Sequence, residues 1–419
     1  WGTQFNRHNT WFGYARPWVD YLRRCSVLLQ TGTPVTDVAY FIGEDTPKMT
    51  GTCQPPLPPG YDFDYINADV IKNRMTVEDG QLVLPGGMRY RLLVLPESKT
   101  MRPALLKRLE DLVDSGGAVL GPRPDRSPSL ENFPACDAEV RDIAAALWGE
   151  GRVMTGNNLE EALQQLQVSP DVICPRGILW KHRKEGETDI YFVSNQRDRK
   201  RTATLSFRVT GRTPELWWPD SGRIETVPFE TADGRTSLSV RLEPAGSVFV
   251  VFGMNTPNAK APKPELEQVA ELSGPWDVAF PSQQVTFDTL TSWTEHSDPT
   301  IKYYSGTATY RKTFAVAEPD PTTVLDLGRV DEMARVRVNG QEVATLWKPA
   351  YTVKIGHVLQ PGENTLEVDV VNTWLNRLVG DAQPGVETGE TFTTTVQWNA
   401  ETPLHSAGLL GPVVLRVAK

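Results

Sequence analysis

The stretch Ala334-Arg-Val-Arg-Val338-Asn339-Gly340 carries the clearest fold signal in the chain. Apolar and charged side chains alternate up to Val338, which is the pattern of a strand with one buried face. Asn-Gly favours a two-residue hairpin turn, because both positions of that turn need a positive φ. The alternation returns over residues 365–371. With further candidate strands on either side, residues 265–419 are expected to form an antiparallel jelly roll.

A polar cluster begins where the alternation of residues 365–371 fails. It contains Asn372, Trp374, Asn376, Arg377 and Asp381, and we expect it to form a loop. Indole faces stack on the C–H-rich faces of sugars, while amide and guanidinium groups bond hydroxyls. The cluster therefore predicts a carbohydrate-binding surface with Asn372, Trp374 and Arg377 as contacts. The alternative is structural, with Arg377 and Asp381 paired to fix a corner of the sandwich.

Residues 34–170 show a different pattern, in which apolar strands alternate with helices. The run Arg91-Leu-Leu-Val-Leu95 suits a strand buried on both faces of a parallel sheet. We expect further strands at residues 35–42 and 118–121, and helices at residues 64–72, 103–114 and 137–147. This order predicts a flavodoxin-like, three-layer α/β domain. Gly116-Gly117 follows a helix, whereas phosphate loops follow a strand, so no nucleotide site is predicted.

The hydrophobic period changes to two between residues 171 and 254. Short strands there, including residues 190–194, 203–209, 238–242 and 247–252, predict a small β-sandwich. Residues 255–264, Asn-Thr-Pro-Asn-Ala-Lys-Ala-Pro-Lys-Pro, have the composition of a linker. The fold class is therefore multidomain α/β plus all-β, with residues 1–33 as a separate helical segment.

Composition excludes several classes of function. The 43 basic and 52 acidic residues give a net charge of −9, which opposes binding to nucleic acid. The four cysteines and five histidines are scattered without metal-ligand spacing, so neither a metal site nor a cofactor is predicted. No apolar run approaches the roughly 18–20 residues that cross a bilayer. The first residue is Trp1 rather than Met, which indicates a processed or excised piece.

Several stretches carry a family resemblance, in order and spacing, over almost the whole chain. They include Arg7-His8-Asn9-Thr10-Trp11, Pro17-Trp18-Val-Asp20-Tyr21, Tyr40-Phe-Ile-Gly43-Glu44-Asp45, Gly60-Tyr61-Asp62-Phe63-Asp64 and Leu272-Ser-Gly274-x-Trp276. The chain resembles the C-terminal half of glycoside hydrolase family 106, the α-L-rhamnosidases. Its last unit is also similar to the sugar-binding jelly roll of family 2 enzymes.

The resemblance implies an accessory part of a glycosidase. Residues 1–33 would be the last helix region of a catalytic barrel whose catalytic pair lies before Trp1. The expected partners are a plant or bacterial glycan, together with a catalytic barrel or a second copy of the chain. The expected location is periplasmic or secreted. The alternatives are a stand-alone carbohydrate-binding protein and a structural scaffold without a ligand.

Hydrolysis of a glycoside needs two carboxyl groups, one with a raised pKa. The candidate pairs are Glu44 with Asp45, Asp62 with Asp64, and Glu295 with Asp298. Glu44 follows the first strand of the α/β domain, where ligands bind in open sheets, so we expect it to contact sugar rather than to act as the acid. His8 and Trp11, next to the expected barrel mouth, are further candidates for substrate contact, although Trp11 also suits a packing anchor. Catalytic residues are left unassigned.

Overall fold

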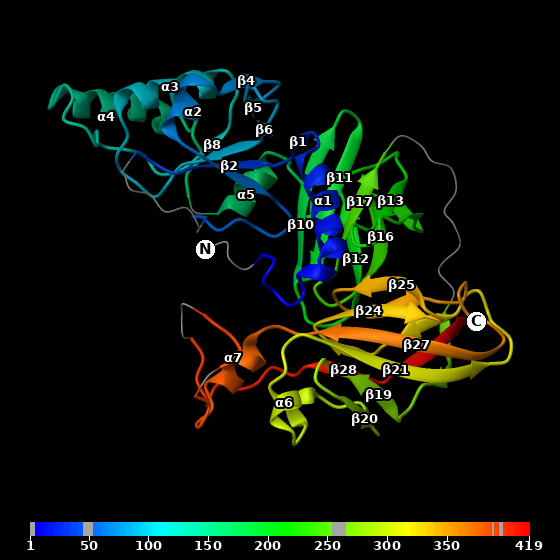
Figure 1. Cartoon of the computed structure of the whole chain (residues 1–419). Helices are drawn as coiled ribbons and strands as arrows, with labels where there is room; N and C mark the ends of the chain where they lie inside the picture. Colours follow the sequence, from blue (N-terminus) through cyan, green and yellow to red (C-terminus); the bar gives the residue numbers. More distant parts are fainter. Residues whose placement is uncertain (1–4, 45–52, 157, 254–264, 388, 394–396) are drawn as a thin grey trace. The chain divides into compact units, whose positions relative to one another are not determined.

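The computed structural model describes residues 5–44, 53–156, 158–253, 265–387, 389–393 and 397–419 (Figure 1). The chain divides into two compact units. The jelly-roll unit comprises Trp1–Arg24 and Ala261–Lys419, and the central unit comprises Cys25–Lys260. The expected linker at residues 255–264 lies outside the described residues. Helix α1, Arg16–Gln30, contains the point in the sequence, between Arg24 and Cys25, where the first unit ends and the central unit begins.

A parallel sheet lies at the centre of the α/β part of the central unit. Its strands, in spatial order, are β3 (Phe63–Ile66), β2 (Val38–Phe41), β7 (Leu92–Val94) and β8 (Val119–Leu120), and each neighbouring pair is parallel. Alternate residues of β2 enter different clusters, with Ala39 and Phe41 on one face and Val38 and Tyr40 on the other. The sheet is therefore buried on both faces, which explains its continuous apolar runs.

Helices cover each face of this sheet. The first cluster includes residues of α2 (Ala68–Asn73), α3 (Pro103–Asp114) and α4 (Ala135–Gly149), and the second includes residues of α5 (Leu159–Gln165). A small antiparallel sheet of β4 (Thr76–Glu78), β5 (Gln81–Val83) and β6 (Arg89–Tyr90) lies beside the first cluster. The expected helix at residues 103–114 is confirmed, whereas α5 was not predicted.

The helix expected at residues 64–72 begins later than predicted. Residues up to Ile66 belong to β3, and Asn67 caps α2 by accepting a hydrogen bond from the amide of Val70 at 3.0 Å. An Asn side chain favours the N-cap because it satisfies an amide that has no partner within the helix. The sequence pattern missed this boundary because Phe63, Ile66 and Val70 recur at i, i+3 and i+7, which is helical spacing.

The remainder of the central unit is a sandwich of two antiparallel sheets. One contains β1 (Thr33–Pro34), β10 (Ile178–Glu185), β11 (Thr188–Asn195), β17 (Ser247–Phe252), β13 (Pro214–Trp217) and β14 (Ile224–Thr226). The other contains β15 (Phe229–Ala232), β16 (Arg235–Leu242), β12 (Arg201–Phe207) and β9 (Val172–Ile173). Every residue of β17 is buried, because this strand pairs with β11 and β13 at the middle of its sheet.

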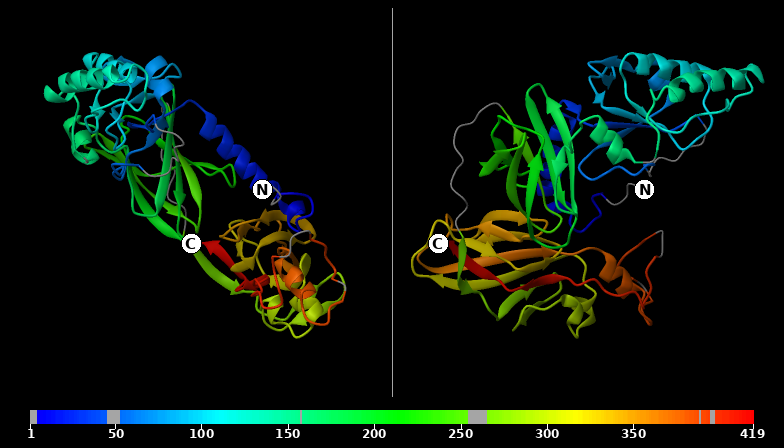
Figure 2. Two further views of the ribbon diagram at one scale, coloured as in Figure 1. Left: turned by 90° about the vertical axis from the view of Figure 1, so that its left-hand side faces the viewer. Right: turned by 180° about the vertical axis from the view of Figure 1, so that it is seen from behind.

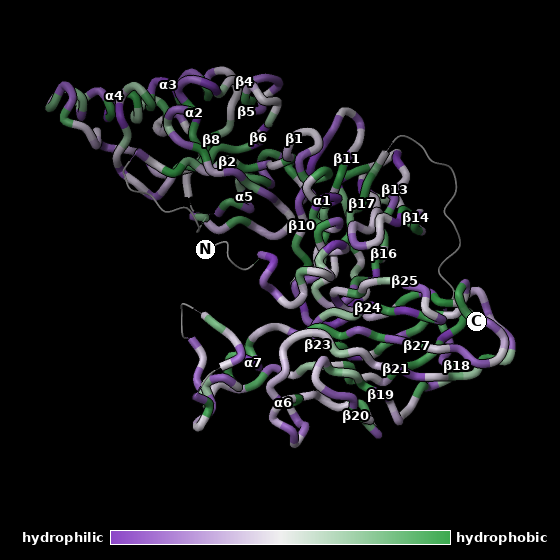
Figure 3. The backbone as a smooth tube through the Cα atoms, viewed as in Figure 1, coloured by the Kyte–Doolittle hydropathy of each residue, from purple (hydrophilic) through white to green (hydrophobic). Residues whose placement is uncertain are grey.

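The jelly-roll unit also contains two main sheets. The larger has the order β20 (Gln284–Phe287), β19 (Trp276–Ala279), β21 (Thr307–Val316), β27 (Gly362–Val371), β24 (Met333–Val338) and β25 (Gln341–Leu346). The smaller has β18 (Leu266–Glu271), β29 (Val414–Ala418), β22 (Val324–Asp326) and β26 (Thr352–Lys354), while β23 (Arg329–Asp331) pairs with β28 (Gly408–Gly411). Trp276, Trp293 and Tyr310 are fully buried in the shared core, and Figure 3 shows the apolar residues along these strands.

The Asn339-Gly340 hairpin prediction is confirmed. These two residues join β24 to β25 with φ values of 51° and 76°. Short helices interrupt the rest of the unit, namely η1 (Phe12–Tyr14), η2 (Trp293–Glu295), α6 (Pro299–Lys302) and α7 (Leu375–Asp381). The prediction of a loop after residue 371 was therefore wrong over residues 375–381.

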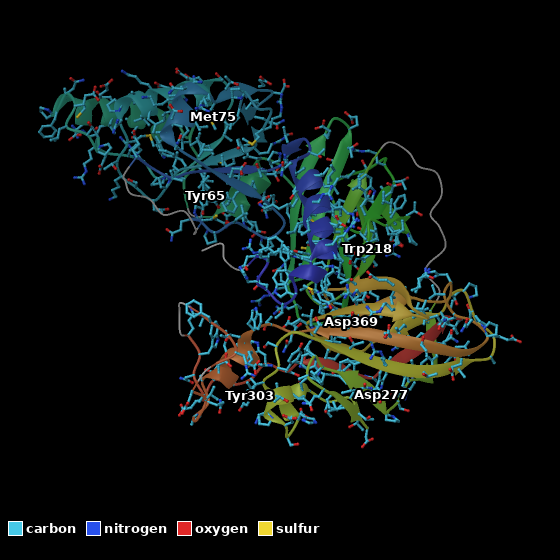
Figure 4. All side chains as sticks on the ribbon, viewed as in Figure 1. Tyr65, Met75, Trp218, Asp277, Tyr303 and Asp369 are labelled. Carbon is cyan, nitrogen blue, oxygen red and sulfur yellow. The ribbon has the colours of Figure 1, made fainter. Side chains whose placement is uncertain are left out.

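Close packing fixes the position of α7. A Cβ built on Gly380 would lie 2.6 Å from Cβ of Tyr303, a residue labelled in Figure 4. Only glycine fits this approach without a shift of the backbone. Asn376, Arg377 and Asp381 of the polar cluster thus lie on a short helix, which can approach Tyr303 closely because Gly380 has no Cβ.

Candidate functional site

The N-terminal segment packs against the jelly roll, so residues from the two ends of the sequence meet in one unit. The Thr10 hydroxyl donates to the backbone oxygen of Asn372. The hydroxyl groups of Tyr14 and Thr307 lie 3.2 Å apart, and the guanidinium carbon of Arg335 lies 4.7 Å from the centre of the Tyr14 ring. Figure 2 shows the blue N-terminal segment beside this unit.

His8 and Trp374 come together at this contact. The indole Nε1–H of Trp374 donates to the backbone oxygen of His8 at 2.7 Å. This bond fixes the ring while leaving 38% of Trp374 exposed, and His8 is exposed as well. We call this the His8–Trp374 surface. A tryptophan with its N–H bonded and its ring accessible is suited to stacking on an apolar sugar face.

Trp11 lies in an aromatic cluster at the base of the N-terminal segment. Its ring stacks on Phe5 at 5.8 Å and meets Trp18 edge to face at 5.9 Å. Phe5 is itself 5.5 Å from Phe12, and both phenylalanines are exposed. These ring contacts are those of a packing anchor, as the structural alternative for Trp11 expected. That Trp11 also contacts a sugar stays a prediction.

The two asparagines of the cluster hold loops together. Asn372 accepts a hydrogen bond from the amide of Gly306 and donates to the oxygen of Tyr304, both at 2.9 Å. Asn376 exchanges two hydrogen bonds with the backbone of His405, at 2.7 and 2.9 Å. The two side chains are 4% and 1% exposed. These amide groups are therefore engaged with backbone in the described structure.

Arg377 and Asp381 form the pair considered as the structural alternative. Arg377 Nε lies 2.9 Å from Asp381 Oδ1, without the alignment of a hydrogen bond. Asp381 Oδ2 accepts from the amide of Thr391 at 2.9 Å and from its hydroxyl at 2.5 Å. Burial alone would raise the pKa of Asp381, but these hydrogen bonds and the charge of Arg377 hold it below its usual range. The pair fixes α7 to the following loop.

Glu44 belongs to the central unit and serves there as a helix cap. Its Oε2 accepts from the backbone amide of Arg102 at 2.7 Å, and Arg102 Nε lies 3.6 Å from Oε1. Arg102 is the N-cap of α3 and has no side-chain capping bond of its own. A carboxylate at this position satisfies an unpaired amide and favours the helix dipole. The Glu44 side chain is 8% exposed, and its contact with a sugar stays a prediction.

Three of the other candidate carboxylates, Asp62, Asp64 and Asp298, also have structural partners. Both oxygens of Asp62 lie 2.7 Å from Lys181 Nζ, and Asp64 accepts from the Tyr90 hydroxyl at 3.0 Å. Asp298 caps α6, and hydrogen bonds from Gln283 and Thr300 lower its pKa. Asp45 lies outside the described residues. These contacts explain the carboxylates without assigning them a role in hydrolysis.

More than half of the chain matches the model of a known protein family. The family model for α-L-rhamnosidase, glycoside hydrolase family 106, matches residues 1–231. The chain belongs to this family. A second model, the galactose-binding domain-like part of glycosyl hydrolase family 2, matches residues 285–405, which lie in the jelly roll.

Two known proteins are similar to this α-L-rhamnosidase family member along its length. The structure of a rhamnosidase from Novosphingobium sp. PP1Y is 37% identical, with a TM-score of 0.88 over 99% of this chain and 42% of that one. A protein of Formosa agariphila named "Putative beta-glucuronidase" is 26% identical over 99% of this chain and 58% of its own length. The chain thus spans about half the length of these relatives.

Sequence reasoning missed a buried charged group in the central unit of this family member. His182 Nδ1 lies 2.7 Å from Asp171, and His182 Nε2 lies 2.9 Å from Asp189. Burial opposes the charged imidazole, but the two carboxylates outweigh it and raise the pKa of His182. A signal was present, because His182 occupies an inward position of β10, two residues after Trp180 and four after Ile178.

The described part of this family member has no group of three or more His, Cys, Asp or Glu residues placed to hold a metal ion. No helix within the same residues has the length and apolar character needed to cross a membrane.

Proposed function

We propose that this chain is an accessory part of a glycoside hydrolase that removes terminal α-L-rhamnose from plant or bacterial glycans. Membership of the α-L-rhamnosidase family supports this proposal, as does the 37% identity to a rhamnosidase of which the chain covers 42%. The sheets of the described residues are one open parallel sheet and several antiparallel ones, whereas a catalytic barrel is a closed parallel sheet. We therefore assign hydrolysis to a barrel domain of the longer enzyme or of a partner chain.

Within this part, we assign sugar contact to the His8–Trp374 surface. The observation that carries the assignment is the Trp374 ring, fixed by its bond to His8 and still 38% exposed. A rigid indole loses little conformational freedom when it stacks on a sugar. The match of a galactose-binding-like model to residues 285–405 supports a carbohydrate partner for the same unit. A stand-alone carbohydrate-binding protein would use the same surface.

A structural scaffold is the second candidate, and a specific observation favours it. Asn372 and Asn376 direct their polar groups to neighbouring loops, and Arg377 pairs with Asp381 of its own helix and donates to Glu390 of the following loop. In a scaffold, the hydrogen bond from Trp374 to the His8 oxygen would serve to hold the N-terminal segment on the jelly roll. The two candidates differ in whether the exposed ring face binds a ligand.

Calorimetry with methyl α-L-rhamnoside separates these candidates. Trp374→Ala should weaken binding by about 1–3 kcal/mol, from loss of the apolar area of the ring. Phe392→Ala is the matched control, because Phe392 is an aromatic residue of the same unit with 90% of its surface exposed. A drop in melting temperature for Trp374→Ala, without any effect of the sugar on either protein, would establish the scaffold.

The finer domain assignment is also a proposal. The strand order β3-β2-β7-β8 supports a flavodoxin-like domain over residues 34–170, followed by a β-sandwich over residues 171–254 and a jelly roll over residues 265–419. We assign residues 1–33 to the last helix region of a barrel, of which Trp1–Arg24 belongs to the jelly-roll unit.

A further inference from the structure

The central unit contains a cavity of about 410 Å³ with an excess of positive charge in its lining. Its basic residues are Arg89, Arg91, Lys184 and Arg208, and its acidic residue is Asp37. This volume falls within the roughly 300–1,000 Å³ of small-molecule sites. The cavity lies where β1, the hairpin of β5 and β6, the residues after α5 and strand β10 meet.

Two of the four cations are neutralised by carboxylates. Arg208 donates to both oxygens of Asp37 at 3.0 Å. Arg89 donates to Glu78 Oε2 at 2.6 Å. These two arginines therefore contribute little net charge to the cavity.

The other two cations have no such partner. In the described parts of the chain, the side chains of Arg91 and Lys184 neither donate a hydrogen bond nor form an ion pair. Both residues are half-buried, so their charges are partly removed from water. The acid of the lining, Asp37, forms its ion pair with Arg208, and Arg91 interacts with it only through its charge. One carboxylate, Asp37, therefore faces both Arg208 and Arg91, and Lys184 forms no ion pair, so partly desolvated positive charge remains that a bound anion would offset.

The backbone around the two cations is held in place by hydrogen bonds. The Arg91 amide donates to the oxygen of Asp37 at 2.8 Å, and the amide of Val35 donates to the oxygen of His182 at 3.0 Å. The neighbour of Lys184, Arg183, donates from Nε to the oxygen of Thr31 at 2.7 Å. A site fixed before binding avoids part of the entropy cost of holding a ligand.

We propose that this cavity binds the anionic group of an acidic saccharide, a carboxylate or a sulfate ester, through Arg91 and Lys184. An arginine fork matches the planar carboxylate or the oxygens of a sulfate. Thr33, Gln81 and Gln167 in the lining supply hydroxyl and amide groups suited to sugar hydroxyls. This site is independent of the His8–Trp374 surface.

Calorimetry on the whole chain tests this proposal with four probes at constant ionic strength. Glucuronate and glucose 6-sulfate represent the two acidic sugars, and glucose and inorganic sulfate represent the sugar and the anion alone. We expect at least one acidic sugar to bind about tenfold more tightly than glucose, since charge-assisted hydrogen bonds are the stronger class. Comparison of the two acidic sugars distinguishes a carboxylate from a sulfate ester.

Two variants and two controls locate the binding. Arg91→Gln and Lys184→Gln should each weaken binding of the acidic sugar on the order of tenfold. Both should nearly keep the melting temperature, because neither side chain donates a hydrogen bond or forms an ion pair among the described residues. Arg241→Gln removes an exposed charge from β16 of the same unit, and it should leave binding unchanged. Trp374→Ala should also have no effect, which separates this site from the surface proposed for rhamnose.

The proposal is overturned if neither acidic sugar binds more tightly than glucose. It is equally overturned if both Arg91→Gln and Lys184→Gln bind the acidic sugar as the unchanged chain does. Inorganic sulfate binding as tightly as glucose 6-sulfate, with no binding of glucuronate, would replace the saccharide with a free oxyanion.

Discussion

Replacement of His182 by Gln should destabilise the central unit and remove part of its pH dependence. The imidazole is 6% exposed, and its two nitrogens lie 2.7 Å from Asp171 and 2.9 Å from Asp189. Only the protonated ring can donate at both nitrogens. His182→Gln therefore removes two charge-assisted hydrogen bonds of about 1.5–3 kcal/mol each.

The surrounding partners limit this loss. Asp171 keeps its hydrogen bond from the Tyr191 hydroxyl at 2.8 Å, and Asp189 keeps Arg212 at 2.6 Å. Neither carboxylate becomes fully unpaired. Breaking a buried ion pair typically costs about 3–5 kcal/mol of stability, and we expect His182→Gln to lose no more than this.

The sign of the pH dependence follows from the raised pKa of His182. A group that is more basic in the folded state binds its proton more tightly there, so its contribution to stability is fully present below its unfolded pKa of about 6.5. That contribution is lost as pH rises through the folded pKa. The stability of the central unit should therefore fall with rising pH on the alkaline side of 6.5.

Hydrogen exchange of the β10–β11 amides as a function of pH measures this effect locally, without requiring two-state unfolding of the whole chain. After correction for the intrinsic exchange rate, protection should decrease with rising pH in the unchanged chain and vary less in His182→Gln. His357→Gln is the control, since His357 is exposed in the jelly-roll unit. The same pH dependence in the unchanged chain and in His182→Gln would refute the assignment of a charged His182.

Three further predictions concern packing, folding and activity. Gly380→Ala should destabilise the jelly-roll unit by about 1–3 kcal/mol, because its Cβ would lie 2.6 Å from Tyr303, whereas Gly149→Ala, at the end of α4 with open space around it, should not destabilise the central unit in thermal melts. Residues 266–419 expressed alone should show a cooperative thermal transition, with a melting temperature below that of a form joined to residues 1–24; an aggregated product would contradict this boundary. The chain should show no turnover of an aryl α-L-rhamnoside, and any turnover abolished by Glu44→Gln would disprove the assignment of hydrolysis to another domain.

The sequence by itself determined the elements whose signals are local. Helix α3 begins at Pro103 and ends at Asp114 as predicted, because proline suits the first turn and Gly116-Gly117 follows its end. The Asn339-Gly340 hairpin and strand β17 were also predicted from local sequence patterns. Each of these patterns lies within a few consecutive residues and needs no distant partner.

Tertiary structure alone decided which groups meet. Trp374 and His8 are 366 positions apart, and only packing of the N-terminal segment on the jelly roll brings the indole to the His8 oxygen. Helix α7 forms where a loop was expected, since its place depends on the fit of Gly380 against Tyr303. The Glu44 carboxylate accepts a hydrogen bond from the amide of Arg102, the N-cap of α3, 58 residues later, and no local pattern predicts this contact. A carboxylate, an amide or an indole has the same chemistry whether it caps a helix, joins two segments or binds a ligand. Long-range contacts determine which of these roles the side chain has.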